Sequence, residues 1–242
     1  MKKERLDQLL IAKKLVDDAK EAFIVVTEGR VRVNGQKAIS PAQLADLEAV
    51  ITIREEEKYV GRGAYKIEAA LQSFHINVEG AVCADIGAAT GGFTQVLLAH
   101  GALRVYAIDT ARGKLALKLR QDPRVVVMEE TDVRKIEKLP ELARYGTMDV
   151  SLISLRNILP YINRFLLPEG EVIALFKPQY ETRDPRILKR GVIQDKEFRE
   201  KLLYDFIEWA EKNGWKVKNR MESPIRGSEG NVEYLLLLNP KS

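Results

Sequence analysis

The chain has 242 residues and few of the side chains that disulfides and metal sites require. Its one cysteine, Cys83, cannot form an internal disulfide, and its two histidines, His75 and His100, show no zinc-ligand spacing. No run of about 18 apolar residues is present, which excludes a membrane-spanning helix. The first residues, Met-Lys-Lys-Glu-Arg-Leu-Asp, lack the apolar core of an export signal. We therefore expect a cytoplasmic protein with no metal and no membrane partner.

The composition predicts a large domain with a well-formed core beside a small one. Hydrophobic residues make up 45% of the chain, and the net charge of +4 permits nucleic-acid binding without demanding it. Residues 1–37 hold nine Lys and Arg against six Asp and Glu, a surplus of three positive charges. We assign residues 1–57 to a small domain, 58–63 to a linker and 64–242 to a larger domain.

The sequence of the small domain predicts two helices followed by a hairpin. Helical spacing covers Arg5 to Lys14 and Asp18 to Glu28, Arg30 to Val33 alternates, and Asn34-Gly35 is a hairpin-turn signal, with another strand over Ala49 to Ile53. This plan resembles the RNA-binding domain named after ribosomal protein S-four. The resemblance implies RNA contacts from basic residues, for which the candidates are Arg5, Lys13, Lys14, Lys20, Arg30, Arg32 and, in the linker, Arg62.

One departure bears on that resemblance. The S-four-type family usually has Ser-Arg at the start of its second helix, whereas this chain has Val16-Asp17-Asp18-Ala19. Two aspartates on a face that meets phosphate would repel it, which weakens RNA binding by this domain without removing it.

A glycine-rich segment, Asp85-Ile-Gly-Ala-Ala-Thr-Gly-Gly-Phe-Thr94, links an apolar run to a helical pattern. A strand, a glycine turn and a helix in this order build nucleotide sites, because a glycine lets the backbone approach a ligand. The spacing does not fit the dinucleotide motif Gly-x-Gly-x-x-Gly. It resembles the first motif of S-adenosylmethionine (SAM)-dependent methyltransferases, and a turn without a ligand is the alternative. The implied cofactor residues are Asp85, Gly87, Ala88, Thr90, Gly91, Gly92 and Phe93.

Two further acids follow strands. Asp109 ends the strand Arg104 to Asp109, about 20 residues after the loop, where an acid can accept hydrogen bonds from ribose hydroxyls. Asp132 follows the strand Arg124 to Met128, where methyltransferases often contact adenine. The alternatives are a strand-end cap for Asp109 and a helix start for Asp132.

The alternation of strands and helices predicts an α/β fold. Helices are expected near 64–74, 91–100, 112–119, 157–167 and 196–213, and strands near 81–84, 104–109, 124–128, 148–155, 171–177, 215–221 and 232–238. This order favours a Rossmann-like, mostly parallel sheet covered on both faces. The last two strands have no helix between them, so one strand at the end of the sheet should be antiparallel.

Three charged residues stand at unusual places. Lys177 ends the apolar strand Glu171 to Phe176, Lys66 follows the linker, and Glu233 interrupts an apolar strand, where an acid needs a partner. Taken singly, the lysines could extend to solvent and Glu233 could lie on an exposed strand face.

Six motifs in order resemble the TlyA family. They are Arg62-Gly-Ala-Tyr-Lys66, the glycine loop, Asp149-Val-Ser-Leu-Ile-Ser-Leu155, Lys177-Pro-Gln-Tyr-Glu181, Gly191-Val-Ile-Gln-Asp195 and Gly230-Asn-Val-Glu233. These proteins are FtsJ-like ribosomal RNA 2′-O-methyltransferases with an S-four-type domain, often misnamed haemolysins. The resemblance implies SAM as cofactor, ribosomal RNA (with cytidine as target) as substrate, no metal, and a catalytic tetrad formed by Lys66, Asp149, Lys177 and Glu233. Our hypothesis makes Lys177 the base and Lys66 the group that tunes it, and the sequence does not separate these two roles.

The position of the catalytic acid stays open at this stage. A gap-free count back from Lys177 selects Asp149, but the apolar pattern Val150 to Leu155 makes Asp149 the start of a strand and moves Ser154 to the catalytic position. With Ser154 there, the chain would be an impaired enzyme or a pure RNA binder. A membrane-active cytolysin is the remaining alternative, and we see no amphipathic stretch that favours it.

Overall fold

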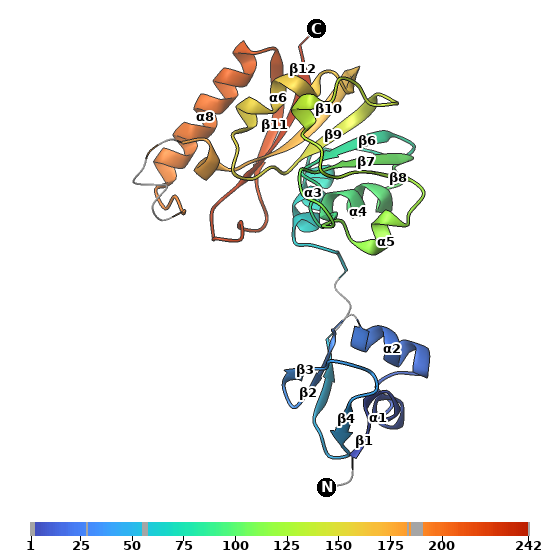
Figure 1. Ribbon diagram of the computed structural model, residues 1–242. Helices are drawn as coiled ribbons and strands as arrows, with labels where there is room; N and C mark the ends of the chain where they lie inside the picture. The colour runs from blue at the N-terminus through green and yellow to red at the C-terminus, as the bar shows by residue number, and fades with distance from the viewer. Residues whose placement is uncertain (1–2, 28, 55–57, 183, 185–190, 242) are drawn as a thin grey trace. The chain divides into compact units, whose positions relative to one another are not determined.

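The computed structural model describes residues 3–27, 29–54, 58–182, 184 and 191–241, so the predicted boundary at residue 57 and the predicted helix end at Glu28 lie outside them. The chain separates into two compact units, Met1–Lys58 and Tyr59–Ser242 (Figure 1). The predicted linker residues 59–63 belong to the larger unit. Tyr59 is buried there, its ring edge-on to Tyr65 at 5.1 Å, and the Val60 N–H donates to the Gln95 side chain (2.8 Å).

The small unit contains two helices and two antiparallel sheets. The helices are α1 (Leu6–Ala12) and α2 (Ala19–Thr27), and the strands are β1 (Lys3–Arg5), β2 (Val31–Val33), β3 (Gln36–Lys37), β4 (Leu44–Asp46) and β5 (Ile51–Ile53). Strand β1 pairs with β4, and the other sheet has the order β3-β2-β5. The hairpin signal is confirmed, because Asn34 and Gly35 both have positive φ, at 50° and 81°, between β2 and β3.

Two sequence predictions for this unit needed correction. The helix predicted from Arg5 to Lys14 spans only Leu6 to Ala12, because Lys14 has a φ of 56° and Arg5 pairs in β1 instead. The strand predicted from Ala49 begins at Ile51, and β4 was not predicted at all. Such two- and three-residue strands carry too few side chains to show a sequence period.

The larger unit is built on a seven-stranded sheet with the order β11-β12-β10-β9-β6-β7-β8. The bounds are β6 (Val82–Ile86), β7 (Arg104–Ile108), β8 (Val125–Met128), β9 (Ala143–Met148), β10 (Leu166–Phe176), β11 (Trp215–Glu222) and β12 (Tyr234–Pro240). The β6 to β10 pairs are parallel, and β12 is antiparallel to both of its neighbours. The antiparallel strand was predicted at the end of the sheet but lies one place inside it, because β11 takes the edge.

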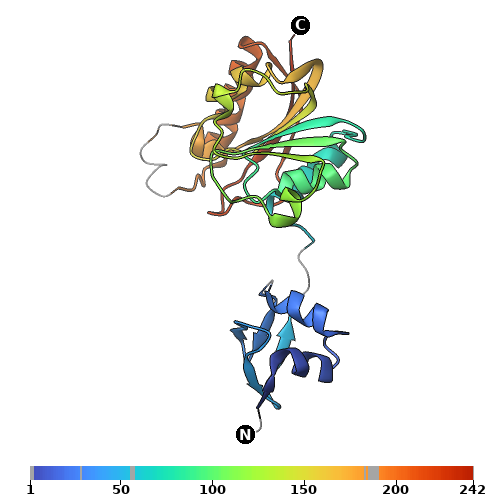
Figure 2. The ribbon, with the colours of Figure 1, turned by 45° about the vertical axis from the view of Figure 1, so that its right-hand side comes forward.

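Helices cover both faces of this sheet (Figures 1 and 2). On one face pack α3 (Gly63–Ser73), α4 (Gly92–Ala99) and α5 (Leu117–Arg120), and on the other α6 (Leu159–Ile162) and α8 (Lys196–Lys212). Alternate residues of one strand enter different cores: Ile173 and Leu175 of β10 face the first group, and Val172 and Ala174 face the second. Short 3-10 turns, η1 (Val133–Lys135), η2 (Leu155–Asn157) and η3 (Pro178–Tyr180), follow three of the strands.

The fourth parallel strand is not where the apolar pattern predicted it. Residues 143–148 form β9, and residues 150–154 form a loop in which Leu152 is exposed with a φ of 64°. Gly146 is favourable in β9 because a Cβ there would lie 3.2 Å from Val172 of β10. The buried Thr147 hydroxyl is satisfied by Asp85 (2.9 Å). These contacts depend on neighbouring strands, so local hydrophobicity does not reveal them.

Two helix predictions were also too long. The helix expected near 157–167 is divided into η2 and α6, and β10 already begins at Leu166. The helix expected near 112–119 is reduced to α5, because residues 113–115 form a loop held by Glu129.

Candidate active site

Functional candidates follow the carboxyl ends of the parallel strands. The residue directly after each strand is Gly87 for β6, Asp109 for β7, Asp149 for β9 and Lys177 for β10. Glu233 directly precedes β12, and because that strand is antiparallel its amino end lies at the same edge of the sheet. Open α/β sheets bind ligands at this edge.

The glycines of the loop after β6 leave space for neighbouring parts of the protein. A Cβ on Gly87, whose φ is 82°, would lie 2.3 Å from the carbonyl oxygen of Asp149. A Cβ on Gly91 would lie 2.2 Å from Leu119 Cδ1, and one on Gly92 3.0 Å from the Ala64 nitrogen. The loop therefore brings α3, α5 and the Asp149 segment into close contact.

Asp85 lies in β6, next to the start of this loop. Its carboxylate is fully buried and accepts hydrogen bonds from the hydroxyls of Thr94 (2.6 Å) and Thr147 (2.9 Å). Burial raises the pKa of Asp85 to about 6, and the two hydroxyls oppose that rise. Asp85 was predicted as a cofactor residue, but its described contacts join β6, α4 and β9.

A cavity of about 280 Å³ lies above the ends of β6, β7 and β9. Of the predicted cofactor residues it is lined by Gly87, Asp109 and Asp132, together with apolar side chains such as Ile108, Val133, Ile153 and Ile158. Asp85, Ala88, Thr90, Gly91, Gly92 and Phe93 are not among its described lining residues. Phe93 packs in the core beside α3, and the Thr90 carbonyl accepts the Ala116 N–H (3.2 Å).

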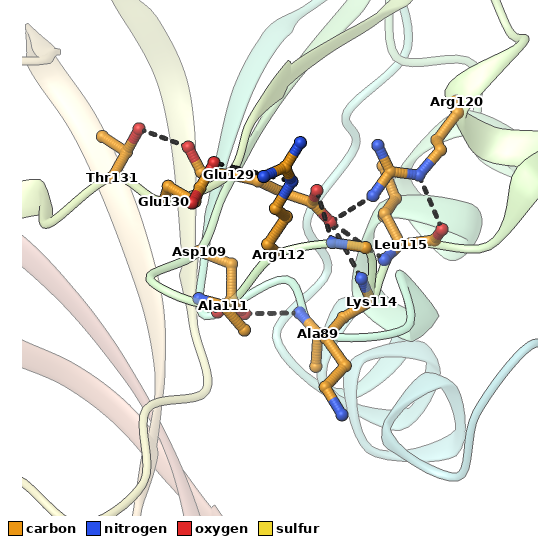
Figure 3. Close-up of polar contacts among 11 residues, drawn as sticks. Ala89, Asp109, Ala111, Arg112, Lys114, Leu115, Arg120, Glu129, Glu130 and Thr131 are labelled. Atoms are coloured by element: carbon orange, nitrogen blue, oxygen red, sulfur yellow. Dashed lines mark hydrogen bonds and ion pairs between the residues drawn. The ribbon is translucent and has the colours of Figure 1, made fainter.

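Two of the acids that line this cavity, Asp109 and Asp132, differ in how much hydrogen-bond acceptor capacity they have left. Asp109 accepts the N–H groups of Ala89 (2.8 Å) and Ala111 (2.7 Å), one on each oxygen (Figure 3). A carboxylate has about four acceptor sites, so two remain. Asp132 accepts four hydrogen bonds from Arg134, the shortest 2.6 Å, and these contacts lower its pKa to about 2.

The four residues of the predicted tetrad lie around one cavity of about 260 Å³. Lys66 Nζ is 2.5 Å from Glu233 Oε2, and Lys177 Nζ is 2.6 Å from Asp149 Oδ1. Lys66, Lys177 and Glu233 are buried, and the Asp149 side chain is 23% exposed. This cavity shares Gly87, Ala89, Asp149 and Ser151 with the first one, so the two are adjacent.

Asp149, and not Ser154, lies beside Lys177. Asp149 directly follows β9, and its N–H donates to the Ile86 carbonyl (2.9 Å) at the end of β6. Ser154 instead begins η2, and its hydroxyl donates to Glu181 Oε2 (2.6 Å). Glu181 also accepts the Leu155 N–H (2.7 Å), so Ser154 belongs to a loop-capping network outside the tetrad.

Two parts of this site were not predicted from the sequence. Ser151 Oγ accepts a hydrogen bond from Lys177 Nζ (2.8 Å), so Lys177 has Ser151 as a polar partner in addition to Asp149. The loop 225–228 lines the cavity and covers Glu233, since a Cβ on Gly227 would lie 2.6 Å from Glu233 Oε1. The lack of a helical pattern between the last two strands is the sequence feature from which this loop could have been predicted.

The predicted RNA-binding residues occupy both units. In the small unit, Arg5 pairs with Asp7 (2.6 Å), Arg30 donates to the Arg54 carbonyl (3.0 Å) and Arg32 to the Gly35 carbonyl (2.8 Å). Lys13, Lys14 and Lys20 are exposed. In the larger unit, Arg62 is exposed, lines the tetrad cavity and donates to the Arg226 carbonyl (3.0 Å).

Known proteins resemble the whole chain. The model of the FtsJ-like methyltransferase family matches residues 59–240. The 16S/23S rRNA (cytidine-2′-O)-methyltransferase TlyA of Mycobacterium tuberculosis is 36% identical across 100% of this chain and 91% of its own length. Hemolysin A of Brachyspira hyodysenteriae is 39% identical across 96% and 98%. A solved structure from Streptococcus thermophilus, also named after hemolysins, has a TM-score of 0.75 and 38% identity, covering 100% of this chain and 90% of that one.

Proposed function

The chain belongs to the FtsJ-like methyltransferase family, and we propose that it methylates the ribose 2′-hydroxyl of a cytidine in ribosomal RNA, with SAM as methyl donor. The observation that carries this proposal is the meeting of Lys66, Asp149, Lys177 and Glu233 around one cavity. A pure RNA binder does not require these two lysine–carboxylate pairs, in which Lys66, Lys177 and Glu233 are buried, because burying charged groups costs free energy that ion pairing often does not recover.

The adjacent 280 Å³ cavity fits an adenosine-type cofactor. Asp109 retains two acceptor sites for ribose hydroxyls, and the apolar side chains of Ile108, Val133 and Ile158 supply a surface for a purine ring. Asp132 contributes less directly, because Arg134 already occupies its carboxylate. SAM, when bound, would supply a methyl carbon made electrophilic by its positively charged sulfur, which would leave as the neutral thioether.

The chain's own residues then handle the proton. A ribose hydroxyl is a weak nucleophile at neutral pH, so it needs a base within hydrogen-bond reach. Lys177, in its amine form, accepts the hydroxyl proton, and Asp149 at 2.6 Å stabilises the ammonium that results. Ser151 orients the amine, and the Lys66–Glu233 pair holds the hydroxyl in line with the methyl group.

The small unit serves in this proposal as an S-four-type domain that docks on folded RNA through phosphate contacts. Its basic surplus supports that role. The departure at Asp18 has a structural reason: its carboxylate accepts the Glu21 N–H (2.8 Å) and caps the start of α2. Ribosomal RNA as substrate places the enzyme in the cytoplasm.

A cytolysin is the function that the names of some relatives suggest. The described helices include none with the length and apolarity needed to span a bilayer.

The test is transfer of a labelled methyl group from SAM to unmethylated ribosomal subunits. The intact protein should label the RNA, and the label should be recovered as 2′-O-methylcytidine next to a phosphodiester that resists alkali. Lys177→Ala should lose about 100-fold or more in rate. Lys218→Ala is the matched control, because Lys218 also pairs with a carboxylate, Glu171 (2.5 Å), but lines neither cavity.

Calorimetric titration with SAM separates the possible failures. If the intact protein binds SAM but labels neither subunit, the proposed substrate is wrong. If Lys177→Ala retains full activity, the assignment of the base is wrong.

A further inference from the structure

Two loops line one side of the cavity that we assign to the adenosine-type cofactor. The first begins at Asp109 and Thr110 after β7, and the second carries Thr131, Asp132 and Val133 after β8. The two loops are joined by backbone bonds: the Glu130 N–H donates to the Ala111 carbonyl (3.2 Å), and the Thr131 N–H to the Asp109 carbonyl (2.9 Å). The position of Asp109 in the cavity therefore depends on how firmly these loops are held together.

Glu129, the first residue after β8, is the polar centre of this junction (Figure 3). Its Oε2 accepts the Gly113 N–H (2.7 Å), and its Oε1 accepts the N–H groups of Lys114 (3.0 Å) and Leu115 (3.2 Å). Three successive backbone donors thus converge on one carboxylate, an arrangement that proteins use to bind anions. The Glu129 side chain is only 12% exposed.

Arg120 completes the arrangement from α5. It forms an ion pair with Glu129, and its Nε donates to the Leu115 carbonyl (3.0 Å), so one guanidinium bridges the carboxylate and the loop. Arg120 and the three N–H groups lower the pKa of Glu129 to about 2, with Arg120 as the largest cause. At neutral pH Glu129 is therefore ionised, and its hydrogen bonds to the loop and to Arg120 are charge-assisted.

We propose that Glu129 is a positioning residue for the cofactor: its carboxylate fixes residues 113–115, and through them it keeps Asp109 and Thr110 in place to receive the adenosine part of the ligand. Glu129 acts at a distance, because the described cavity lining includes Asp109 and Thr110 but not Glu129 itself. This inference rests on the proposed function only in taking an adenosine-type ligand for this cavity.

The variant Glu129→Gln tests the inference, because it keeps the size of the side chain and removes the charge. Its amide NH₂ would face a backbone N–H or Arg120, so at least one donor loses its acceptor. We expect the Kd for SAM to rise about ten-fold, the size of a lost charge-assisted hydrogen bond. The kcat at saturating SAM and the KM for RNA should stay within two-fold of the parent.

Glu141→Gln is the matched control. Glu141 also pairs with an arginine, Arg104, but that arginine begins β7, at the opposite end from Asp109. This control should leave the Kd for SAM unchanged. Arg120→Gln is a second test variant in case Glu129→Gln does not fold; it leaves the three N–H contacts in place and should raise the Kd several-fold.

The measurements are SAM titration by calorimetry and steady-state kinetics with both substrates. An unchanged Kd in both Glu129→Gln and Arg120→Gln would overturn the inference, and so would a loss confined to kcat or to the KM for RNA. An intact protein that does not bind SAM would instead overturn the proposed cofactor, so the two failures are distinguishable.

Discussion

Replacing Asp85 by Asn should stabilise the larger unit at pH 8. Asp85 is fully buried between Thr94 and Thr147, and burial raises its pKa from 3.8 to about 6. At pH 8 the folded chain must therefore hold an ionised carboxylate away from water. An asparagine at this position carries no charge. It can still satisfy both threonines, because its oxygen can accept from one hydroxyl and its NH₂ can donate to the other.

The magnitude follows from the shift in pKa. Each pKa unit corresponds to about 1.4 kcal/mol, so the ionised Asp85 destabilises the fold by about 3 kcal/mol at pH 8. Between about pH 4 and pH 6 the folded chain binds this proton more tightly than the unfolded chain, so stability falls as the pH rises through this window. The advantage of Asp85→Asn should accordingly shrink from about 3 kcal/mol at pH 8 toward zero near pH 4.

Urea denaturation followed by tryptophan fluorescence is the assay. Both tryptophans, Trp209 and Trp215, lie in the larger unit, so the signal reports that unit alone. Parent and variant are compared at pH 8, 6 and 4.5. A variant that is less stable than the parent at pH 8, or a difference that does not change with pH, would refute the reasoning. The first result would mean that the two threonines need a carboxylate, and the second that Asp85 titrates normally.

Two further predictions concern the loop after β6 and the small unit. Gly87→Ala should lower the rate of methyl transfer by about 100-fold, because its Cβ would press on the Asp149 carbonyl at 2.3 Å and misplace the tetrad. Gly80→Ala is the control, since Gly80 also has positive φ (68°) but its Cβ would meet no described atom within 4 Å; equal activity of the two variants would contradict the prediction. Asp18→Ala should destabilise α2 by about 1 kcal/mol through loss of its helix cap, measured by amide hydrogen exchange in α2. Asp17→Ala is the control. The Asp17 backbone N–H donates to the Glu21 carboxylate, and this bond does not need the Asp17 side chain, so the variant should have a smaller effect. Equal exchange in both variants would exclude Asp18 as the cap.

Local sequence patterns were sufficient for much of the fold. The apolar run before Asp85, the glycine turn and the helical pattern after it predicted β6, the loop and α4. Asn34-Gly35 predicted the hairpin of the small unit, because both residues tolerate positive φ. Lys177 could be placed at the end of a buried strand from the six apolar or acidic residues before it. Each of these features depends on a few consecutive residues, whose own geometry decides the outcome.

Tertiary structure alone decided which charged groups meet. The sequence predicted that Lys66, Asp149, Lys177 and Glu233 act together, but it did not show that Lys66 pairs with Glu233, 167 residues away, or that Lys177 pairs with Asp149. The apolar pattern of the sequence placed the fourth parallel strand wrongly, because β9 is held by contacts of Thr147 and Gly146 with other strands. Asp85, Ser151 and Glu129 acquire their roles in the same way. Hydrophobic periodicity records whether a residue is buried, whereas the partner of a buried polar group depends on the order of strands in the sheet, which no local pattern contains.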